Sequence, residues 1–123
     1  MQTKFFTAKE ANQTLPLVKK IVAYILTNGN TVRELCTKIG TAAEAHPDVV
    51  RLMDQLEELF AELESLGCSY KDWNFTAGLV DFPAVLDGDE VCLCWKSDEP
   101  SVAFYHDLES GFAGRKAIPA KYL

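Results

Sequence analysis

Apolar side chains recur at alternating steps of three and four residues in two stretches of the first 66 residues. In the first stretch the recurring positions are Leu15, Val18, Val22, Ile25, Gly29, Val32, Cys36, Ile39 and Ala43. In the second they are Val49, Leu52, Leu56, Leu59, Leu63 and Leu66, with Met53 and Phe60 beside them. Such spacing places apolar side chains along one side of a helix and is typical of helices that pair along their length. Because only a short connection around His46-Pro47-Asp48 separates the stretches, they predict a long antiparallel, coiled-coil-like helical hairpin over about residues 8–67.

Capping and breaking residues mark the expected ends of these helices. Thr7-Ala8-Lys9-Glu10 has the pattern of a capping box, in which the Thr and Glu side chains satisfy each other's backbone amides. Pro16 has no amide donor and is expected to interrupt or restart the first helix. Gly29 leaves two possibilities open, a continuous helix or a kink or break. Gly67 is expected to end the second helix.

The two helices differ in charge and in length. Residues 16–45 hold four basic and two acidic residues, whereas residues 48–66 hold one basic and six acidic residues. This opposite excess favours pairing between the two helices, although an exposed ion pair contributes only about 0.2–1 kcal/mol. A continuous helix from Pro16 to Ala43 would be roughly 42 Å long, and the second helix roughly 28 Å. The overhanging segment from Leu15 to Ile25 therefore needs cover from the C-terminal sheet or a second subunit, and we expect a homodimer.

The second half of the chain changes to the two-residue period of strands. Gly78 to Phe82 predicts a short strand that Pro83 ends, and Asp87-Gly88 is a turn signal. Residues 90–96 and 101–106 predict a hairpin around residues 97–100. With that loop centred, Val91, Leu93 and Trp95 share a face with Val102, Phe104 and His106, and Cys92 and Cys94 share the other with Ala103 and Tyr105. The expected fold is a single α+β domain over residues 1–123, with the helical hairpin packed on a small antiparallel sheet over about residues 78–118.

Composition restricts the classes of partner and the compartment. The 123 residues carry a net charge of −6, and the longest basic cluster is Lys19-Lys20, so nucleic-acid binding is disfavoured. No apolar run reaches the roughly 18–20 residues of a membrane span, and the N-terminus does not have the pattern of a signal peptide. We therefore expect a soluble cytoplasmic protein without membrane contact. In that compartment the four cysteines are expected to be reduced thiols.

Three segments resemble one known family. They are GLVDFPAVLDGDEVCLCWKSDEPSVAFYHDLESGFAGR at residues 78–115, FFTAKEANQTLPLV near the start, and LESLGCSYKD before the sheet. The pattern they form is similar to that of the DUF2203 family of small prokaryotic proteins of unknown function. The resemblance covers essentially the whole chain, and it implies no activity, substrate or cofactor.

His106 is the centre of the candidate site. Imidazole is a common metal ligand and general base. If the strand around Asp81 lies beside the hairpin, His106 meets Asp81 and Glu99 in a mixed cluster that could hold a divalent metal. The other interpretation is a hydrogen-bonded histidine at a strand end against Trp95. No metal-binding motif in the sequence supports the metal.

Asp81 and Arg115 form the second part of the candidate site. A carboxylate inside an apolar strand must be paired or exposed, and the planar fork of Arg115 is a suitable partner. Arg115 then either clamps an anionic ligand or forms a salt bridge that fixes the C-terminal tail to the sheet. The turn from Gly111 to Arg115 could form a backbone nest for an anion, or its glycines could serve only a tight turn.

The cysteines and aromatic residues carry weaker signals. Cys92 and Cys94 are too close for a zinc loop and have no second pair at ligand spacing, so a four-cysteine zinc site is disfavoured. The expected register places both cysteines opposite His106, which also disfavours a nucleophilic Cys–His pair. Trp73, Trp95, Phe104 and Tyr105 are expected in the core, and Trp95 has the best claim of the four to line a pocket beside Glu99 and His106.

Two classes of function remain open after the sequence alone. The first is a binding or scaffold module that associates through its long helices. The second is a small-molecule or metal-dependent site built from Asp81, Trp95, Glu99, His106 and Arg115. The first is favoured because no catalytic spacing is complete.

Overall fold

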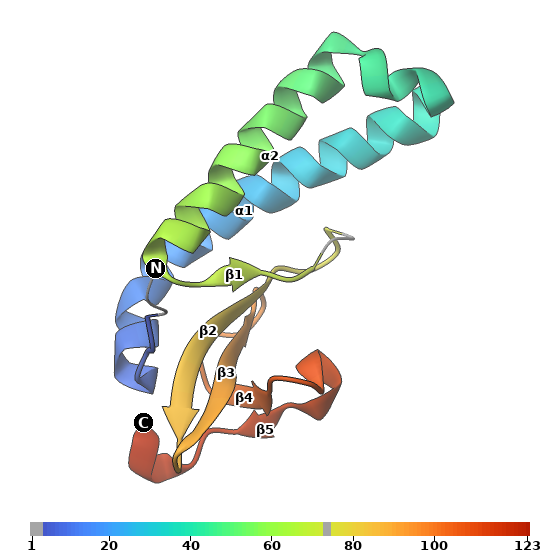
Figure 1. Cartoon of the computed structure of the whole chain (residues 1–123). Coiled ribbons are helices and arrows are strands. Elements are labelled where there is room, and N and C mark those ends of the chain that lie inside the picture. The colour runs from blue at the N-terminus through green and yellow to red at the C-terminus, as the bar shows by residue number, and fades with distance from the viewer. Residues whose placement is uncertain (1–3, 73–74) are drawn as a thin grey trace.

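The computed structural model describes residues 4–72 and 75–123 and has an α+β fold (Figure 1). Two helices, α1 (Ala8–Ile39) and α2 (Pro47–Leu66), are joined by a 3-10 helix over Gly40–Ala45. Five antiparallel strands follow in the order β1-β2-β3-β4-β5. Their bounds are Ser69–Tyr70, Leu79–Leu86, Asp89–Lys96, Phe104–Asp107 and Lys116–Ala117. Short 3-10 helices over Gly111–Gly114 and Ala120–Tyr122 flank β5. Trp73, expected in the core, lies outside the described residues.

Helix α1 begins at the predicted capping box and runs without interruption. The Thr7 amide donates to Glu10 Oε1 at 3.0 Å, and the Glu10 amide donates to Thr7 Oγ1 at 3.1 Å. The expected interruption at Pro16 is wrong, because one continuous helix includes it. The cost of the missing amide is offset by burial of the neighbouring side chains Leu15 and Val18, which are 3% and 0% exposed.

The helix also continues through Gly29, where close packing explains the glycine. A Cβ atom at this position would lie 2.2 Å from Cδ1 of Phe75, far inside van der Waals contact. The absence of a side chain therefore lets the Phe75 ring pack directly on α1. Helix α2 ends at Gly67, as predicted, with a left-handed φ of 98°.

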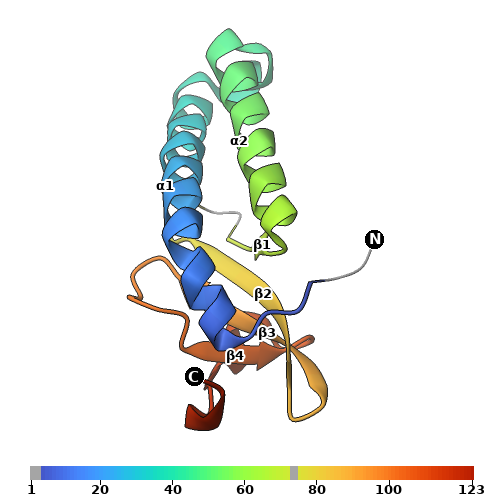
Figure 2. The same ribbon diagram turned by 90° about the vertical axis from the view of Figure 1, so that its left-hand side faces the viewer.

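The first half of α1 packs against the sheet, which supplies the cover that the overhanging segment needs. The two helices lie side by side and extend beyond the sheet in both views (Figures 1 and 2). The buried residues of α1 in this region are Leu15, Val18, Ile21, Val22 and Ile25. They share one core with the inner face of the sheet, formed mainly by Val80, Phe82, Leu93 and Trp95. No helix in the described ranges is long and apolar enough to span a bilayer.

Strand β2 passes through Pro83 instead of ending there. In a strand the N and C=O groups of one residue point to the same edge, and the Pro83 carbonyl accepts a 2.7 Å hydrogen bond from the Phe6 amide. The nitrogen of Pro83 therefore also points away from β3, where no ladder bond is lost. The proline is tolerated because β1 pairs only with Val80 and Asp81, so at Pro83 this edge of β2 faces the N-terminal segment and not another strand.

The register of β3 and β4 differs from the predicted one by one residue. Cys92 lies opposite His106 and Cys94 lies opposite Phe104, so the cysteines and the histidine share a face. The difference arises because β4 begins at Phe104, so the loop after β3 is longer than the predicted one over residues 97–100. Asn12 on α1 holds this loop through two hydrogen bonds to the Val102 backbone, at 2.8 and 3.1 Å.

Candidate functional site

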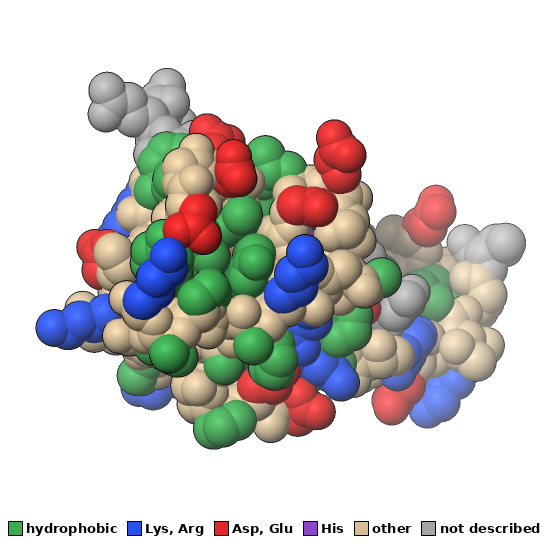
Figure 3. Space-filling view, turned by 90° about the horizontal axis from the view of Figure 1, so that it is seen from below, with side chains coloured by type: hydrophobic (Ala, Val, Ile, Leu, Met, Phe, Trp, Pro, Cys, Tyr) green, Lys and Arg blue, Asp and Glu red, His purple; other side chains and the backbone are tan. Residues whose placement is uncertain are grey.

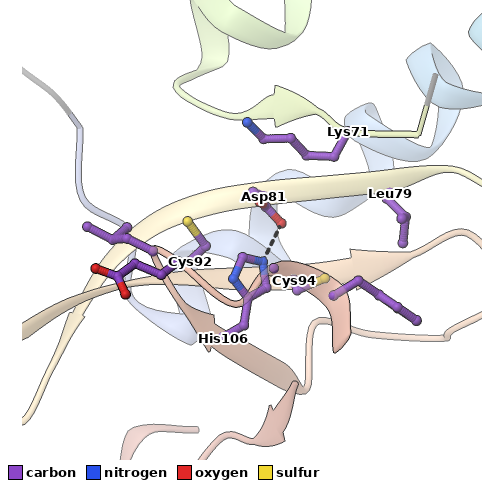
Figure 4. A pocket seen from close by; sticks show the side chains of 10 residues that line it. Lys71, Leu79, Asp81, Cys92, Cys94 and His106 are labelled. Carbon is purple, nitrogen blue, oxygen red and sulfur yellow. Dashed lines mark hydrogen bonds and ion pairs between the residues drawn. The ribbon is translucent and has the colours of Figure 1, made fainter. Parts of the chain in front are cut away.

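Three strands bring three ionisable side chains together on the outer face of the sheet, away from α1. Asp81 comes from β2, Cys94 from β3 and His106 from β4, and they are 7%, 1% and 4% exposed. Their nearest oxygen, sulfur and nitrogen atoms all lie within 4.8 Å of one another. Figure 4 shows the imidazole meeting the carboxylate above β3, with Cys92 and Cys94 on either side. We call Asp81, Cys94 and His106 the sheet-face cluster.

The two ring nitrogens of His106 have different partners. Nδ1 lies 2.7 Å from the backbone carbonyl oxygen of Asp107, and Nε2 lies 3.1 Å from Asp81 Oδ1. A carbonyl oxygen only accepts, so the first contact requires the proton on Nδ1. The ring is thereby fixed with Nε2 directed at the carboxylate.

Burial dominates the chemistry of the two thiols on this face. Removal from water, followed by the negative charge of Asp81, raises the pKa of Cys94 to about 12. Burial and Asp81 also raise the pKa of Cys92, and the positive charge of Lys71 partly opposes them. Neither thiol is therefore an activated nucleophile, although the corrected register places Cys92 beside His106.

A cavity of about 460 Å³ opens over the sheet-face cluster. All three cluster residues line it, together with Cys92. The remaining lining residues are Lys71, Leu79, Leu108, Glu109, Gly111 and Phe112. Lys71 directly follows β1 and extends beside Asp81 (Figure 4). Leu79, Leu108 and Phe112 give the cavity its apolar surface, and the charged side chains of Lys71 and Glu109 line it from outside the strands.

The site lies within a part of the chain that matches a known protein family. A family model described as "Uncharacterized conserved protein (DUF2203)" matches residues 4–118. The chain belongs to the DUF2203 family. No curated protein and no solved structure matches this DUF2203 chain. The residues of the sheet-face cluster and the lining of the cavity all fall within the matched range.

Glu99 and Arg115 form a separate ion pair beside the cluster. Arg115 donates to both carboxylate oxygens of Glu99, at 2.8 and 2.6 Å, and to the Cys94 carbonyl oxygen at 3.0 Å. Its guanidinium also lies over the rings of Phe104 and Phe112, at 4.3 and 4.7 Å from their centroids. The expected pairing of Arg115 with Asp81 is therefore wrong, because Asp81 pairs with His106.

This ion pair has a structural role in the DUF2203 chain. Its side chains are only 14% and 17% exposed, and the fork of Arg115 is occupied by Glu99. Glu99 consequently does not join His106 and Asp81, as the sequence had suggested. Gly111–Gly114 form a 3-10 turn rather than an open nest, and Arg115 ties this turn to β3.

Trp95 lies on the other face of the sheet. It is opposite Val80 in the ladder and 1% exposed, and its indole Nε1 donates to the Glu99 carbonyl oxygen at 2.9 Å. It is part of the core and does not line the cavity, which corrects its assignment as a pocket residue.

Among the site residues, Cys94 was considered from the sequence and disfavoured, and Lys71 was not considered. Cys94 was set apart from His106 by the one-residue slip in register, although the alternation of Cys92, Leu93 and Cys94 was itself visible. Lys71 lies in a segment without a clear period. Only the pairing of Tyr70 with Val80 reveals that the next residue faces the cavity.

Proposed function

We propose that this chain binds a small molecule in the cavity on the outer face of its sheet. The observation that carries the proposal is the buried Asp81–His106 pair at the floor of that cavity. Buried titratable groups in a concave, largely apolar site are typical of binding and catalytic sites. The cavity of about 460 Å³ also lies within the range of roughly 300–1,000 Å³ that such sites occupy.

The lining indicates the chemistry of the ligand. Leu79, Leu108 and Phe112 offer apolar walls, the exposed Lys71 supplies a positive charge beside Asp81, and the exposed Glu109 adds a second carboxylate to the lining. A small molecule with an apolar group and one carboxylate or phosphate matches this arrangement. The apolar group contacts the walls, and the anionic group lies near the ammonium of Lys71.

Phenyl phosphate and benzoate are suitable probes, with uncharged benzamide as the comparison. Nuclear magnetic resonance titration should shift the backbone amides of Cys92 and Gly111 saturably with the anionic probes and less with benzamide. Lys71→Met should weaken the anionic probes, whereas Lys38→Met, at the end of α1, should leave them unchanged. Shifts that do not saturate, or that appear only along the helices, would contradict the proposal.

A second candidate function is self-association through the helices, which we propose to pack as a coiled-coil-like hairpin. An apolar groove of about 340 Å³ near their far end favours it. Val50 and Met53 are 48% and 45% exposed there, beside Val32 and Cys36. The charged residues that line the groove, Glu44 and Asp54, are acidic, whereas α1 as a whole carries a basic excess, so a second copy that brings its α1 against this face would meet opposite charges. We propose a homodimer on this basis.

Sedimentation velocity over a concentration series tests the association. A dimer should form, and Met53→Glu should shift it to monomer, because the substitution places a charge in the apolar groove. Val85→Glu is the matched control, since Val85 is equally exposed (46%) but lies on the sheet. A protein that stays monomeric throughout the series would exclude this candidate.

We also propose that the chain works in the reducing cytoplasm and without nucleic acid. All four cysteines are free thiols, and Cys36 is exposed. On the end of the molecule seen in Figure 3, basic side chains are interspersed with acidic and apolar ones and form no continuous patch among the described residues.

A further inference from the structure

We infer that Asp81, Cys94 and His106 bind one divalent transition-metal ion, with zinc the best match, and present it to the cavity. The inference deepens the proposed function by naming a cofactor of the same site. It does not require that a small molecule also bind, because the three ligands come from the chain itself. Four observations carry it: the ring orientation of His106, the spacing of the ligand atoms, the ligand set, and the open side of the cluster.

The orientation of His106 is that of a metal ligand. Nδ1–H is held by the Asp107 carbonyl oxygen at 2.7 Å, so Nε2, which lies 3.1 Å from Asp81 Oδ1, is the ring nitrogen placed to bind an ion. Histidines that bind metals usually donate their other ring N–H to a backbone carbonyl or carboxylate, which fixes the ring in this way.

The spacing of the ligand atoms suits a tetrahedral ion. With zinc bonds of about 2.0 Å to nitrogen and oxygen and about 2.3 Å to sulfur, neighbouring ligand atoms are separated by about 3.3–3.6 Å. Nε2 and Oδ1 are 3.1 Å apart, and all three ligand atoms lie within 4.8 Å of one another. Small side-chain rotations on rigid, paired strands are therefore enough to reach bonding distance.

The ligand set selects the class of metal. Thiolate and imidazole favour zinc and similar transition metals, whereas magnesium and calcium prefer oxygen ligands alone. A carboxylate and a thiolate together also balance the charge of a divalent ion, which makes burial of all three groups tolerable.

The number of ligands leaves one position for an exogenous group. All three residues line the cavity, so the fourth tetrahedral position opens toward it and not into the protein core. Three protein ligands and one open position distinguish catalytic or ligand-binding zinc sites from structural ones, which are closed by four. The metal would thus meet the anionic group of a bound small molecule.

Cobalt(II) titration of the full chain after chelator treatment tests the inference. We expect one cobalt per chain, with tetrahedral visible bands and a thiolate-to-cobalt charge-transfer band in the near ultraviolet. Cys94→Ser should remove the charge-transfer band and weaken cobalt binding by more than the 10–100-fold typical of indirect effects. Cys92→Ser is the matched control: it removes the neighbouring thiol on the same face and should keep the band. Circular dichroism verifies that each variant is folded.

X-ray absorption of the zinc-loaded wild-type protein needs no variant. The expected first shell has one sulfur and otherwise nitrogen and oxygen. Absence of stoichiometric cobalt binding, a shell without sulfur, or a band lost in Cys92→Ser and kept in Cys94→Ser would overturn the inference. The cluster would then be a buried His106–Asp81 hydrogen-bonded pair that holds no ion. Because phenyl phosphate is titrated separately, into both metal-free and zinc-loaded protein, failure of metal binding is distinguishable from failure of ligand binding.

Discussion

Removing the side chain of Glu99 should strongly destabilise the fold, because it leaves the Arg115 guanidinium without its main partner. Glu99 accepts both prongs of the Arg115 fork and also the Lys96 amide at 2.8 Å. Breaking a buried ion pair by deleting one partner typically costs about 3–5 kcal/mol. The pair is 14% and 17% exposed, and Arg115 keeps the Cys94 carbonyl and two aromatic rings, so we expect about 3 kcal/mol for Glu99→Ala.

Urea denaturation followed by circular dichroism measures this cost directly. For a chain of this size, about 3 kcal/mol corresponds to a melting temperature lower by roughly 9–15 °C. Arg51→Ala is the control, because it breaks an ion pair with Asp48 whose side chains are 63% and 58% exposed. That pair should contribute less than about 1 kcal/mol. If Glu99→Ala costs no more than Arg51→Ala, the structural role of the Glu99–Arg115 pair is refuted.

Two further predictions concern α1. Gly29→Ala should destabilise the protein, because the new Cβ would meet the Phe75 ring, although alanine is the better helix former by about 1 kcal/mol. In a protein that also carries Phe75→Ala, the same change should be neutral or stabilising. Additive costs of the two substitutions in this double-mutant cycle would disprove the packing explanation. Thr7→Ala should lower the free energy of unfolding by about 1 kcal/mol, because it removes the capping box; thermal unfolding measures the change. Thr37→Ala, at an exposed site within the helix, is the control, and an equal loss of stability there would show that the cap is unimportant.

Local signals in the sequence account for much of the helical half. The capping box at Thr7 and the left-handed glycine at Gly67 are determined by neighbouring residues, and both are found where they were predicted. The expected interruption at Pro16 is wrong, and the sequence left open whether the helix continues through Gly29, because the effects of both residues depend on distant ones. The core on both sides offsets the cost of the proline, and a ring 46 positions further along the chain explains the glycine.

The site was only partly predictable, for reasons of register. Asp81 and His106 could be recognised as buried ionisable residues from their positions in apolar strands. Which residues share their face depends on where β4 begins, and Val102, just before that strand, is held by two hydrogen bonds with Asn12 on α1. No local pattern reveals a contact over 90 residues of chain. One residue of slip therefore exchanged Cys94 for Glu99 as the third member of the cluster.

The arrangement of the fold also explains how Glu99 and Arg115 affect the cavity without belonging to the cluster. The helices cover only the inner face of the sheet, and the outer face at Asp81 and His106 depends on the turn that carries Gly111 and Phe112. Arg115 fixes this turn by bonding to Glu99 and to the backbone of Cys94 while contacting the Phe112 ring. A variant such as Glu99→Ala should consequently loosen the wall of the cavity as well as the fold. The affinity of folded Glu99→Ala for phenyl phosphate, compared with that of the wild-type protein, would measure how much the turn with Gly111 and Phe112 contributes to binding, separately from Asp81 and His106.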